Sequence, residues 1–236
     1  MIREYQTKNQ VVWFDEQLLR EDPSQAFDVD FWQQNDAIIG SAEGRGTTWF
    51  IQTQTMQAAL RHYRRGGLFG KLVSDSYWFT GWQETRSYAE FQLLKTLADA
   101  GVHVPKPIAA RAITSGLTYR ADLISEKIAH AEDLVGILQR REMSAEEYYR
   151  VGVEIAKMHH AQVNHTDLNI HNLLLDRDGQ VWIIDFDKCY HQDGTDWQQN
   201  NLDRLLRSFV KEKNKRSIHW QEAHFSPLLE GYQQYK

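Results

Sequence analysis

The sequence has a single cysteine, four prolines and no long apolar run, and each scarcity excludes a class of protein. Cys189 has no partner cysteine, so an internal disulfide is excluded and a reducing compartment is expected. The longest purely apolar runs, such as residues 181–184, are far too short for a membrane-spanning helix. The first ten residues hold no hydrophobic signal core. We therefore expect a cytoplasmic, soluble protein.

An excess of positive charge is also missing. Lys and Arg number 27 against 32 Asp and Glu, which gives a formal net charge of −5. Binding to nucleic-acid phosphates favours a basic domain, so nucleic acid is not the expected main partner. Hydrophobic residues make up 42% and charged residues 25% of the 236 residues, as is usual for a globular protein. This length allows one large domain or two small ones.

The charge that is present is unevenly placed. Residues 44–74 contain no Asp or Glu, but they contain Arg45, Arg61, Arg64, Arg65 and Lys71. Aromatic residues gather beside this window, at Phe69, Tyr77, Trp78, Phe79 and Trp82. Such a window is usually a solvated surface. A surface that meets an anionic partner is the alternative.

The first half of the chain reads mainly as short strands. β-Branched and aromatic residues predict strands at residues 36–40, 47–52, 57–62, 108–114 and 117–124. One helix is expected over about residues 83–100, where Tyr88, Phe91, Leu94 and Ala98 share a face. Gly101 and Pro105 follow the helix as stop signals.

After residue 126 the pattern becomes mainly helical. Ser144 and Glu147 form a capping box before an apolar helical stripe, and similar stripes occur near residues 202–209 and 228–232. Short apolar runs at residues 173–175 and 181–184 predict a hairpin. We therefore expect an α+β protein, with an N-terminal antiparallel sheet lobe containing one helix (residues 1–125) and a mainly helical C-terminal lobe (residues 126–236).

The most specific motif is H-x-D-x-x-x-x-N at residues 165–172, followed by Asp185-Phe186-Asp187 in the place of a D-F-G element. Phosphoryl transfer needs a carboxylate beside the attacking hydroxyl, and Asp167 can supply it. Mg²⁺ prefers hard oxygen ligands, which Asn172 and Asp185 offer. Each piece alone is commonplace, and His165 is expected to brace the loop rather than act as a base. Together and in this order they favour a kinase.

A phosphate cradle is expected upstream of these motifs. Gly40, Gly44 and Gly46 lie between two predicted strands, where backbone N–H groups of a turn can face phosphates. An ordinary hairpin turn is the simpler interpretation. Glu90, on the predicted helix, is the candidate partner for a phosphate-binding cation, although a solvated surface carboxylate would look the same.

These residues resemble a known family. The chain is similar to the bacterial lipopolysaccharide core sugar kinases that act on 3-deoxy-D-manno-octulosonic acid (Kdo), which have a protein-kinase-like fold. The resemblance extends over residues 40–206 and rests on GSAEGRGTTWF (40–50), LRHYRRGG (60–67), YWF (77–79) and the two motifs above. It implies ATP-dependent phosphorylation of a Kdo hydroxyl, expected to be the 4-hydroxyl, on Kdo-lipid A at the cytoplasmic face of the inner membrane.

The resemblance also implies roles for individual residues. Asp167 corresponds to the catalytic-loop base, Asn172 and Asp185 to Mg²⁺ ligands, and Glu90 to the helix carboxylate. Arg61 stands where this fold usually has a strand lysine, and arginine offers phosphate oxygens a planar fork. Asp187 replaces the usual glycine and can add a carboxylate near the metal. ATP and Mg²⁺ are the implied cofactors.

The acceptor and the membrane give the basic window a role. Arg64, Arg65 and Lys71 are expected to face an anionic membrane surface or the acceptor, since each such cation near a membrane contributes about 1 kcal/mol. The alternatives are a heptose kinase, an antibiotic phosphotransferase, a protein kinase and a catalytically inactive nucleotide-binding module. Arg61 favours the inactive module, whereas the intact trio Asp167, Asn172 and Asp185 argues against it.

Overall fold

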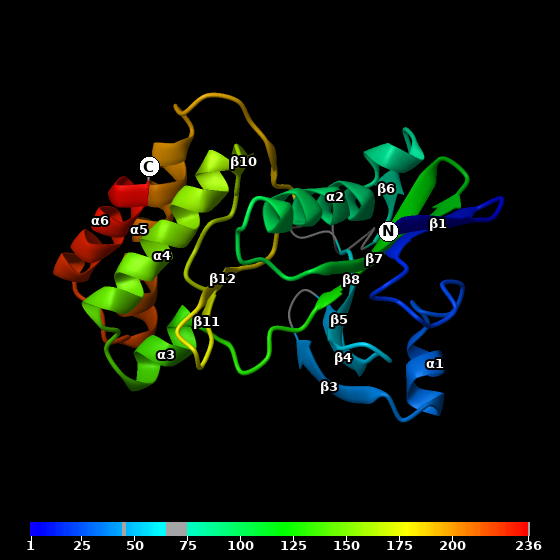
Figure 1. Cartoon of the computed structure of the whole chain (residues 1–236), viewed down its shortest axis with the longest axis horizontal. Coiled ribbons are helices and arrows are strands. Elements are labelled where there is room, and N and C mark those ends of the chain that lie inside the picture. Colours follow the sequence, from blue (N-terminus) through cyan, green and yellow to red (C-terminus); the bar gives the residue numbers. More distant parts are fainter. Residues whose placement is uncertain (44–45, 65–74, 236) are drawn as a thin grey trace. The chain divides into compact units, whose positions relative to one another are not determined.

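A computed structural model describes residues 1–43, 46–64 and 75–235 of the chain. The chain forms two compact units, the first from residues 1–92 and 106–127 and the second from residues 93–105 and 128–236. Antiparallel strands dominate the first unit and helices dominate the second (Figure 1). The expected α+β class is therefore confirmed.

One antiparallel sheet forms the body of the first unit. Its strands pair in the order β1-β2-β7-β8-β5-β4-β3, with β6 also paired to β8. Their bounds are β1 Ile2–Gln6, β2 Gln10–Asp15, β3 Ile38–Glu43, β4 Thr47–Gln52, β5 Gln57–His62, β6 Tyr77–Trp78, β7 Pro107–Ser115 and β8 Thr118–Glu126. The strands expected at residues 47–52 and 57–62 are confirmed with the same bounds.

The N-terminal residues, which the sequence left without a role, belong to the core of this unit. β1 and β2 extend the sheet because β2 pairs with β7. Helix α1 (Val29–Gln34) buries Trp32, whose Nε1 donates to Ala26 O at 2.8 Å. Trp32 packs in the same cluster as Val12, Ile51 and Ile124, which are fully buried. Burial of such side chains is the main stabilising contribution to the unit.

The glycine-rich turn is shorter than the sequence predicts. Gly40 lies inside strand β3 rather than in a turn, at an irregularity in the register with β4. Its φ of +157° is one that side-chain-bearing residues rarely adopt. Between β3 and β4 the structure describes only Gly46, since Gly44 and Arg45 lie outside the described residues. The expected strand over residues 36–40 is therefore shifted toward the turn.

Helix α2 (Arg86–Asp99) begins three residues later than expected and follows the short 3₁₀ helix η2 (Trp82–Glu84). Its buried residues are Ser87, Glu90, Phe91, Leu94 and Leu97. Tyr88 and Ala98, expected on the buried face, are only half-buried because that face is rotated toward Ser87 and Glu90. Gly101 follows the helix with a φ of +78°, in agreement with its predicted role as a stop signal.

Four helices and two small sheets make up most of the second unit. The helices are α3 (Leu134–Arg140), α4 (Ala145–His160), α5 (Gln198–Arg216) and α6 (Phe225–Tyr235), with the 3₁₀ helix η3 (Glu222–His224) before α6. The sheets are β12-β11-β9 and β10-β13, from β9 (Glu132–Asp133), β10 (Val163–Asn164), β11 (Leu173–Leu175), β12 (Val181–Ile183) and β13 (Tyr190–His191). β11 and β12 confirm the expected hairpin.

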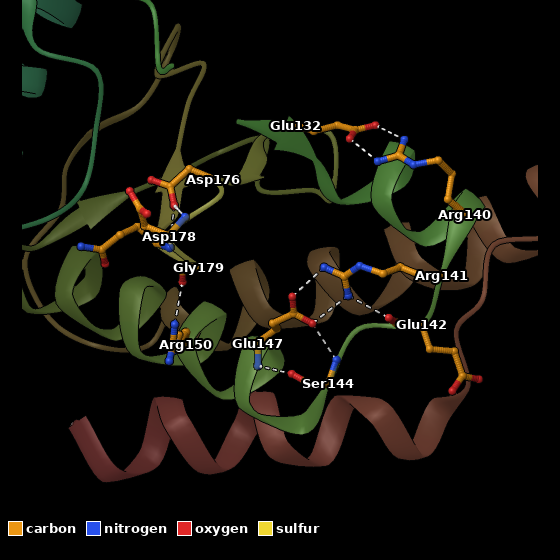
Figure 2. A network of polar contacts seen from close by, with 11 residues as sticks. Glu132, Arg140, Arg141, Glu142, Ser144, Glu147, Arg150, Asp176, Asp178 and Gly179 are labelled. Atoms are coloured by element: carbon orange, nitrogen blue, oxygen red, sulfur yellow. Dashed lines mark hydrogen bonds and ion pairs between the residues drawn. The ribbon is translucent and has the colours of Figure 1, made fainter. Parts of the chain in front are cut away.

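The capping box at the start of α4 is confirmed (Figure 2). Ser144 Oγ accepts from the Glu147 N–H at 3.2 Å, and the Glu147 carboxylate accepts from the Ser144 N–H at 2.7 Å. Arg141 adds two hydrogen bonds to the same carboxylate, at 3.0 and 2.7 Å, and these hold the pKa of Glu147 below its usual value. The helix that leads to the H-x-D-x-x-x-x-N loop therefore has a firmly fixed start.

Helices α4 and α6 cross at two glycines. A Cβ atom on Gly152 would collide with backbone atoms of Leu228 and Tyr232, and one on Gly231 would collide with the backbone of Tyr149. The crossing therefore requires glycine on both helices. It fixes α6 against the helix that precedes the H-x-D-x-x-x-x-N loop.

Candidate active site

His165 anchors the H-x-D-x-x-x-x-N loop inside the second unit. Its side chain is fully buried, its Nε2 donates to Ile184 O at 3.0 Å, and its ring centroid lies 4.9 Å from that of Phe186. Burial lowers the pKa of His165, so the ring is neutral at pH 7. A neutral, buried imidazole joins the loop to the Asp185-Phe186-Asp187 segment and does not serve as the base.

A buried polar network supports the same loop from the helices. Asn201 on α5 accepts the His165 backbone N–H on Oδ1 at 3.2 Å and donates from Nδ2 to Asn164 Oδ1 at 2.8 Å. His159 on α4 lies 3.3 Å from Asn201 Oδ1 through Nε2 and 2.8 Å from the Tyr232 hydroxyl through Nδ1. The loop is thereby tied to α4, α5 and α6.

Asp167 and Asn172 lie at opposite ends of a tight turn. Asn172 Nδ2 donates to Asp167 O at 3.0 Å, and Asn169 Nδ2 donates to the same oxygen at 2.7 Å. The Asp167 backbone is thus held by two amides, while its side chain is 40% exposed. In the part of the chain that the structure describes, Asn172 Oδ1 has no hydrogen-bond donor.

Asp185 is held in a strained conformation next to Asn172. Its φ is +64°, a left-handed value that costs a non-glycine residue on the order of 1–3 kcal/mol and that clusters at functional sites. The preceding residue, Ile184, donates its N–H to Asn172 O at 3.0 Å and accepts from His165 through its carbonyl. These two bonds fix the backbone on the N-terminal side of Asp185 and place it beside the predicted amide ligand.

The donor set in this unit fits a hard divalent cation. Asp185 offers an exposed carboxylate and Asn172 offers an amide oxygen that faces no donor among the described residues. Across residues 1–43, 46–64 and 75–235 there is no group of three or more His, Cys, Asp and Glu side chains that could hold a metal by itself. A site of this kind is completed by phosphate oxygens and water, as is usual for Mg²⁺.

In the first unit the structure brings Arg61 and Glu90 together. Arg61 Nη2 donates to the two Glu90 carboxylate oxygens at 2.6 and 2.7 Å, and the Glu90 side chain is only 4% exposed. The Tyr63 hydroxyl donates to Glu90 Oε2 at 2.5 Å, and the Arg61 guanidinium lies 4.9 Å from the Tyr63 ring centroid. Sequence reasoning missed Tyr63, although it lies two residues from Arg61 along an extended segment and so shares its face.

The structure describes only some of the other predicted site residues of this unit. The Arg64 side chain lies over Gly46, where an added Cβ would come within 2.8 Å of Arg64 Cδ. Arg64 is exposed. Gly44, Arg65 and Lys71 lie outside the described residues. Gly40 lies in strand β3, apart from the turn that holds Gly46.

A cavity of about 500 Å³ lies elsewhere on the second unit, beside α3, α4 and the β11–β12 turn (Figure 2). Two of the arginines that line it are already paired, Arg140 with Glu132 and Arg141 with Glu147. None of the residues predicted to act in catalysis lines this cavity. The turn that carries the partly exposed Asp167 side chain is therefore the better candidate for the reaction site.

Comparison with known proteins gives a consistent result over the whole chain. The sequence profile of the lipopolysaccharide kinase (Kdo/WaaP) family matches residues 29–232. The chain is 63% identical, over 98% of its length, to each of two 3-deoxy-D-manno-octulosonic acid kinases, from Vibrio parahaemolyticus and Vibrio cholerae. The match covers 97% of the first protein and 98% of the second. The kinase of the same name from Haemophilus influenzae is 44% identical over 99% of this chain and 100% of its own length.

The buried network predicts a large effect of one substitution on α5. Asn201→Ala leaves the His165 N–H and Asn164 Oδ1 without partners, and each buried unsatisfied group costs about 1–3 kcal/mol. We expect the free energy of unfolding, measured in urea, to fall by about 2–5 kcal/mol. The His165 amide should also exchange its hydrogen faster. Asn200→Ala, an exposed neighbour on the same helix, should change the unfolding free energy by less than about 0.5 kcal/mol. Equal effects of the two substitutions would contradict the assignment.

Proposed function

The chain belongs to the lipopolysaccharide kinase (Kdo/WaaP) family and is an ATP-dependent kinase, and we propose that it phosphorylates Kdo on Kdo-lipid A, at the 4-hydroxyl. The observation that carries the proposal is the 63% identity, over nearly the full length of both chains, to kinases that are named for this sugar acid. Family membership also confirms the kinase-like fold expected from the sequence. A heptose kinase or an inactive nucleotide-binding module is not favoured.

In the proposed reaction Asp167 is the general base. The acceptor hydroxyl gives its proton to the Asp167 carboxylate while its oxygen forms a bond to the γ-phosphorus of ATP. The bond between that phosphorus and the β–γ bridging oxygen breaks, and its electrons leave with ADP. The two amides that hold the Asp167 backbone support this role, because they fix the loop while the carboxylate stays accessible.

We assign binding of Mg²⁺ to Asn172 and Asp185. The amide oxygen without a donor and the exposed carboxylate beside it support the assignment, and Asp187 follows as a further carboxylate. When bound, the ion neutralises charge on the phosphate oxygens. The strain at Asp185 has a role on this assignment, because it fixes the carboxylate before the ligand arrives.

We assign phosphate binding within residues 1–125 to Arg61 and the glycine residues Gly40, Gly44 and Gly46, and catalysis to residues 126–236. The buried Glu90 carboxylate supports the assignment of Arg61, because it holds the guanidinium in one orientation. The planar guanidinium of an arginine matches the geometry of phosphate oxygens. An arginine in this place is thus compatible with a working kinase.

We further assign the chain a peripheral position at the cytoplasmic face of the inner membrane. No helix in the described part of the chain is long and apolar enough to cross a bilayer. Trp78 and Leu117 are 69% and 75% exposed, and they lie together because β6 pairs with β8 and the Phe79 N–H donates to Leu117 O. Exposed Trp and Leu suit the headgroup level of a membrane. Arg64 is exposed in the same unit, and Arg65 and Lys71 are assigned to this surface from the sequence.

A paired experiment tests the function. Asp167→Asn should lower transfer of phosphate from ATP to Kdo-lipid A by about 10²- to 10⁴-fold, because the base is lost, while Mg²⁺-dependent ATP binding stays near normal. Asp185→Ala should instead abolish the Mg²⁺-dependent part of ATP binding, since a charged ligand is removed. Labelled-phosphate transfer and nucleotide titration with and without Mg²⁺ measure both. Near-normal turnover in Asp167→Asn, or an unchanged metal requirement in Asp185→Ala, would contradict the assignments.

The Arg61–Glu90 pair makes a second prediction. Arg61→Ala should raise the KM for ATP by about 10- to 100-fold, and Glu90→Ala should raise it in parallel because the guanidinium loses its orientation. The double variant should be no worse than either single one, since the two residues act as a unit. Arg120→Ala, an exposed arginine of the same sheet, is the control and should leave the KM unchanged. Additive losses would show that Glu90 acts independently of Arg61.

The membrane assignment predicts a loss of vesicle binding. Trp78→Ser combined with Leu117→Ser should weaken cosedimentation with phosphatidylglycerol vesicles by at least about 10-fold, because burial of each apolar side chain contributes about 1.5–3 kcal/mol. Val210→Ser, which changes an exposed apolar residue of the second unit, should not weaken it. Thermal unfolding verifies that the variants are folded. If the double variant binds vesicles as well as the unaltered protein does, the assigned surface is wrong.

A further inference from the structure

Asp167 has a cationic partner that belongs to neither sequence motif. Arg204 on α5 donates from Nη2 to Asp167 Oδ1 and forms an ion pair with it. The Arg204 side chain is 48% exposed, and the remaining guanidinium donors make no hydrogen bond to any residue that the structure describes. Asp167 Oδ2 is likewise without a donor over the same residues. The pair therefore lies at the surface, and each member has polar atoms that can bind a further partner.

This ion pair hinders the role of Asp167 as a base. Arg204 engages Oδ1 and offsets the negative charge of the carboxylate, so only Oδ2 is left for the acceptor hydroxyl and the carboxylate attracts its proton less strongly. An ion pair between two half-exposed side chains is weak, so another anion can displace the carboxylate from the guanidinium. An anion on the acceptor is the natural competitor, because it arrives together with the hydroxyl. The Asp167–Arg204 pair, as it stands without a bound acceptor, is thus suited to an exchange of partners.

We propose that Arg204 binds the carboxylate of the acceptor sugar acid and releases Asp167 when that carboxylate arrives. The proposal rests on the proposed function, because an octulosonic acid carries the carboxylate on the sugar that is phosphorylated. Arginine presents two parallel N–H donors that match a carboxylate, which favours the exchange over a single hydrogen bond to Oδ1. The freed Asp167 then takes the hydroxyl proton.

The surroundings of Arg204 favour an anionic acceptor. Spacings of three and four residues place Arg207, Lys211 and Lys215 on the same side of α5 as Arg204, and all four are exposed. The nearest acid on the helix, Asp203, accepts from Gln199 Nε2 at 2.8 Å. The basic side of the helix therefore begins at the catalytic carboxylate. A neutral sugar carries no charge that this basic side of the helix could attract.

The exchange makes the acceptor's own charge a condition for catalysis. A sugar acid removes Arg204 from Asp167 as it binds, whereas a neutral sugar leaves Asp167 Oδ1 engaged. Discrimination against neutral acceptors is then expressed in kcat as well as in KM, because both the orientation of the acceptor and the availability of the base change.

The test compares an acid with its neutral analogue. The acceptors are Kdo-lipid A in detergent and the same molecule with the carboxylate of the accepting Kdo converted to the methylamide. In the unaltered enzyme we expect kcat/KM to be about 10- to 100-fold higher for the acid. Arg204→Ala should lower kcat/KM for the acid by a similar factor and leave the amide unchanged or improved, which removes the discrimination. Arg204→Lys should retain part of it, since lysine keeps the charge without the fork.

Matched variants separate this role from general effects of charge. Arg207→Ala removes an exposed arginine one turn along the same helix and should keep the discrimination between acid and amide. If Arg204→Ala lowers kcat/KM equally for the acid and the amide, Arg204 serves Asp167 or the fold and the proposal is overturned. A rise in the KM for ATP with unchanged discrimination would assign Arg204 to the nucleotide and overturn it as well.

Failure of the proposed function gives a different result. If the unaltered enzyme transfers no phosphate to Kdo-lipid A, the proposed function is wrong whatever Arg204 does. Equilibrium binding of free Kdo, measured by calorimetry in the absence of ATP, then decides on Arg204. Binding that Arg204→Ala weakens by at least about 10-fold, with Arg207→Ala unaffected, supports the carboxylate site. Absence of binding, or binding that does not depend on Arg204, overturns it.

Discussion

The geometry of the candidate active site depends on the buried imidazole of His165. It joins the Ile184 carbonyl to a loop whose backbone is held by Asn201, and together with the bond from the Ile184 N–H to Asn172 O it ties the segment of Asp185 to the loop of Asp167. Burial lowers the pKa of His165, and a neutral ring costs far less to desolvate than a charged one would. The strained φ of Asp185 is sustained by the same contacts.

The residues that hold the candidate site differ in burial from the residues that are proposed to react in it. Glu90, His159 and Asn201 are buried and fully committed to partners, and they orient other groups. Asp167 is half-buried and Asp185 is exposed; backbone hydrogen bonds hold the segments around both, and the Asp167 side chain also pairs with Arg204. A half-exposed ion pair such as Asp167–Arg204 can change partners while the loop keeps its shape, which a side chain locked in a buried pair could not do.

Local signals predicted the elements that they specify. The capping box at Ser144, the hairpin of β11 and β12 and strands β4 and β5 all follow from residues a few positions apart. Residue pairs that meet only in the folded chain could not be predicted from such local signals. Asn201 lies 36 positions from His165, and Arg204 lies 37 positions from Asp167. The glycines at the crossing of α4 and α6 could not be predicted either, because the atoms that a Cβ would meet there belong to the opposite helix. Arg61 and Glu90 were paired from the expected fold, not from local pattern.

The distribution of charge explains how an acidic chain can use an anionic acceptor. The net charge of −5 disfavours unspecific association with the phosphates of nucleic acids. Attraction is instead concentrated where it has an effect, on the exposed side of α5 that begins at Arg204. On our proposal the Arg204 guanidinium binds the carboxylate of the acceptor, and it pairs with Asp167 when no acceptor is bound. Recognition and activation are then one event, since the acceptor cannot be bound correctly without also freeing Asp167.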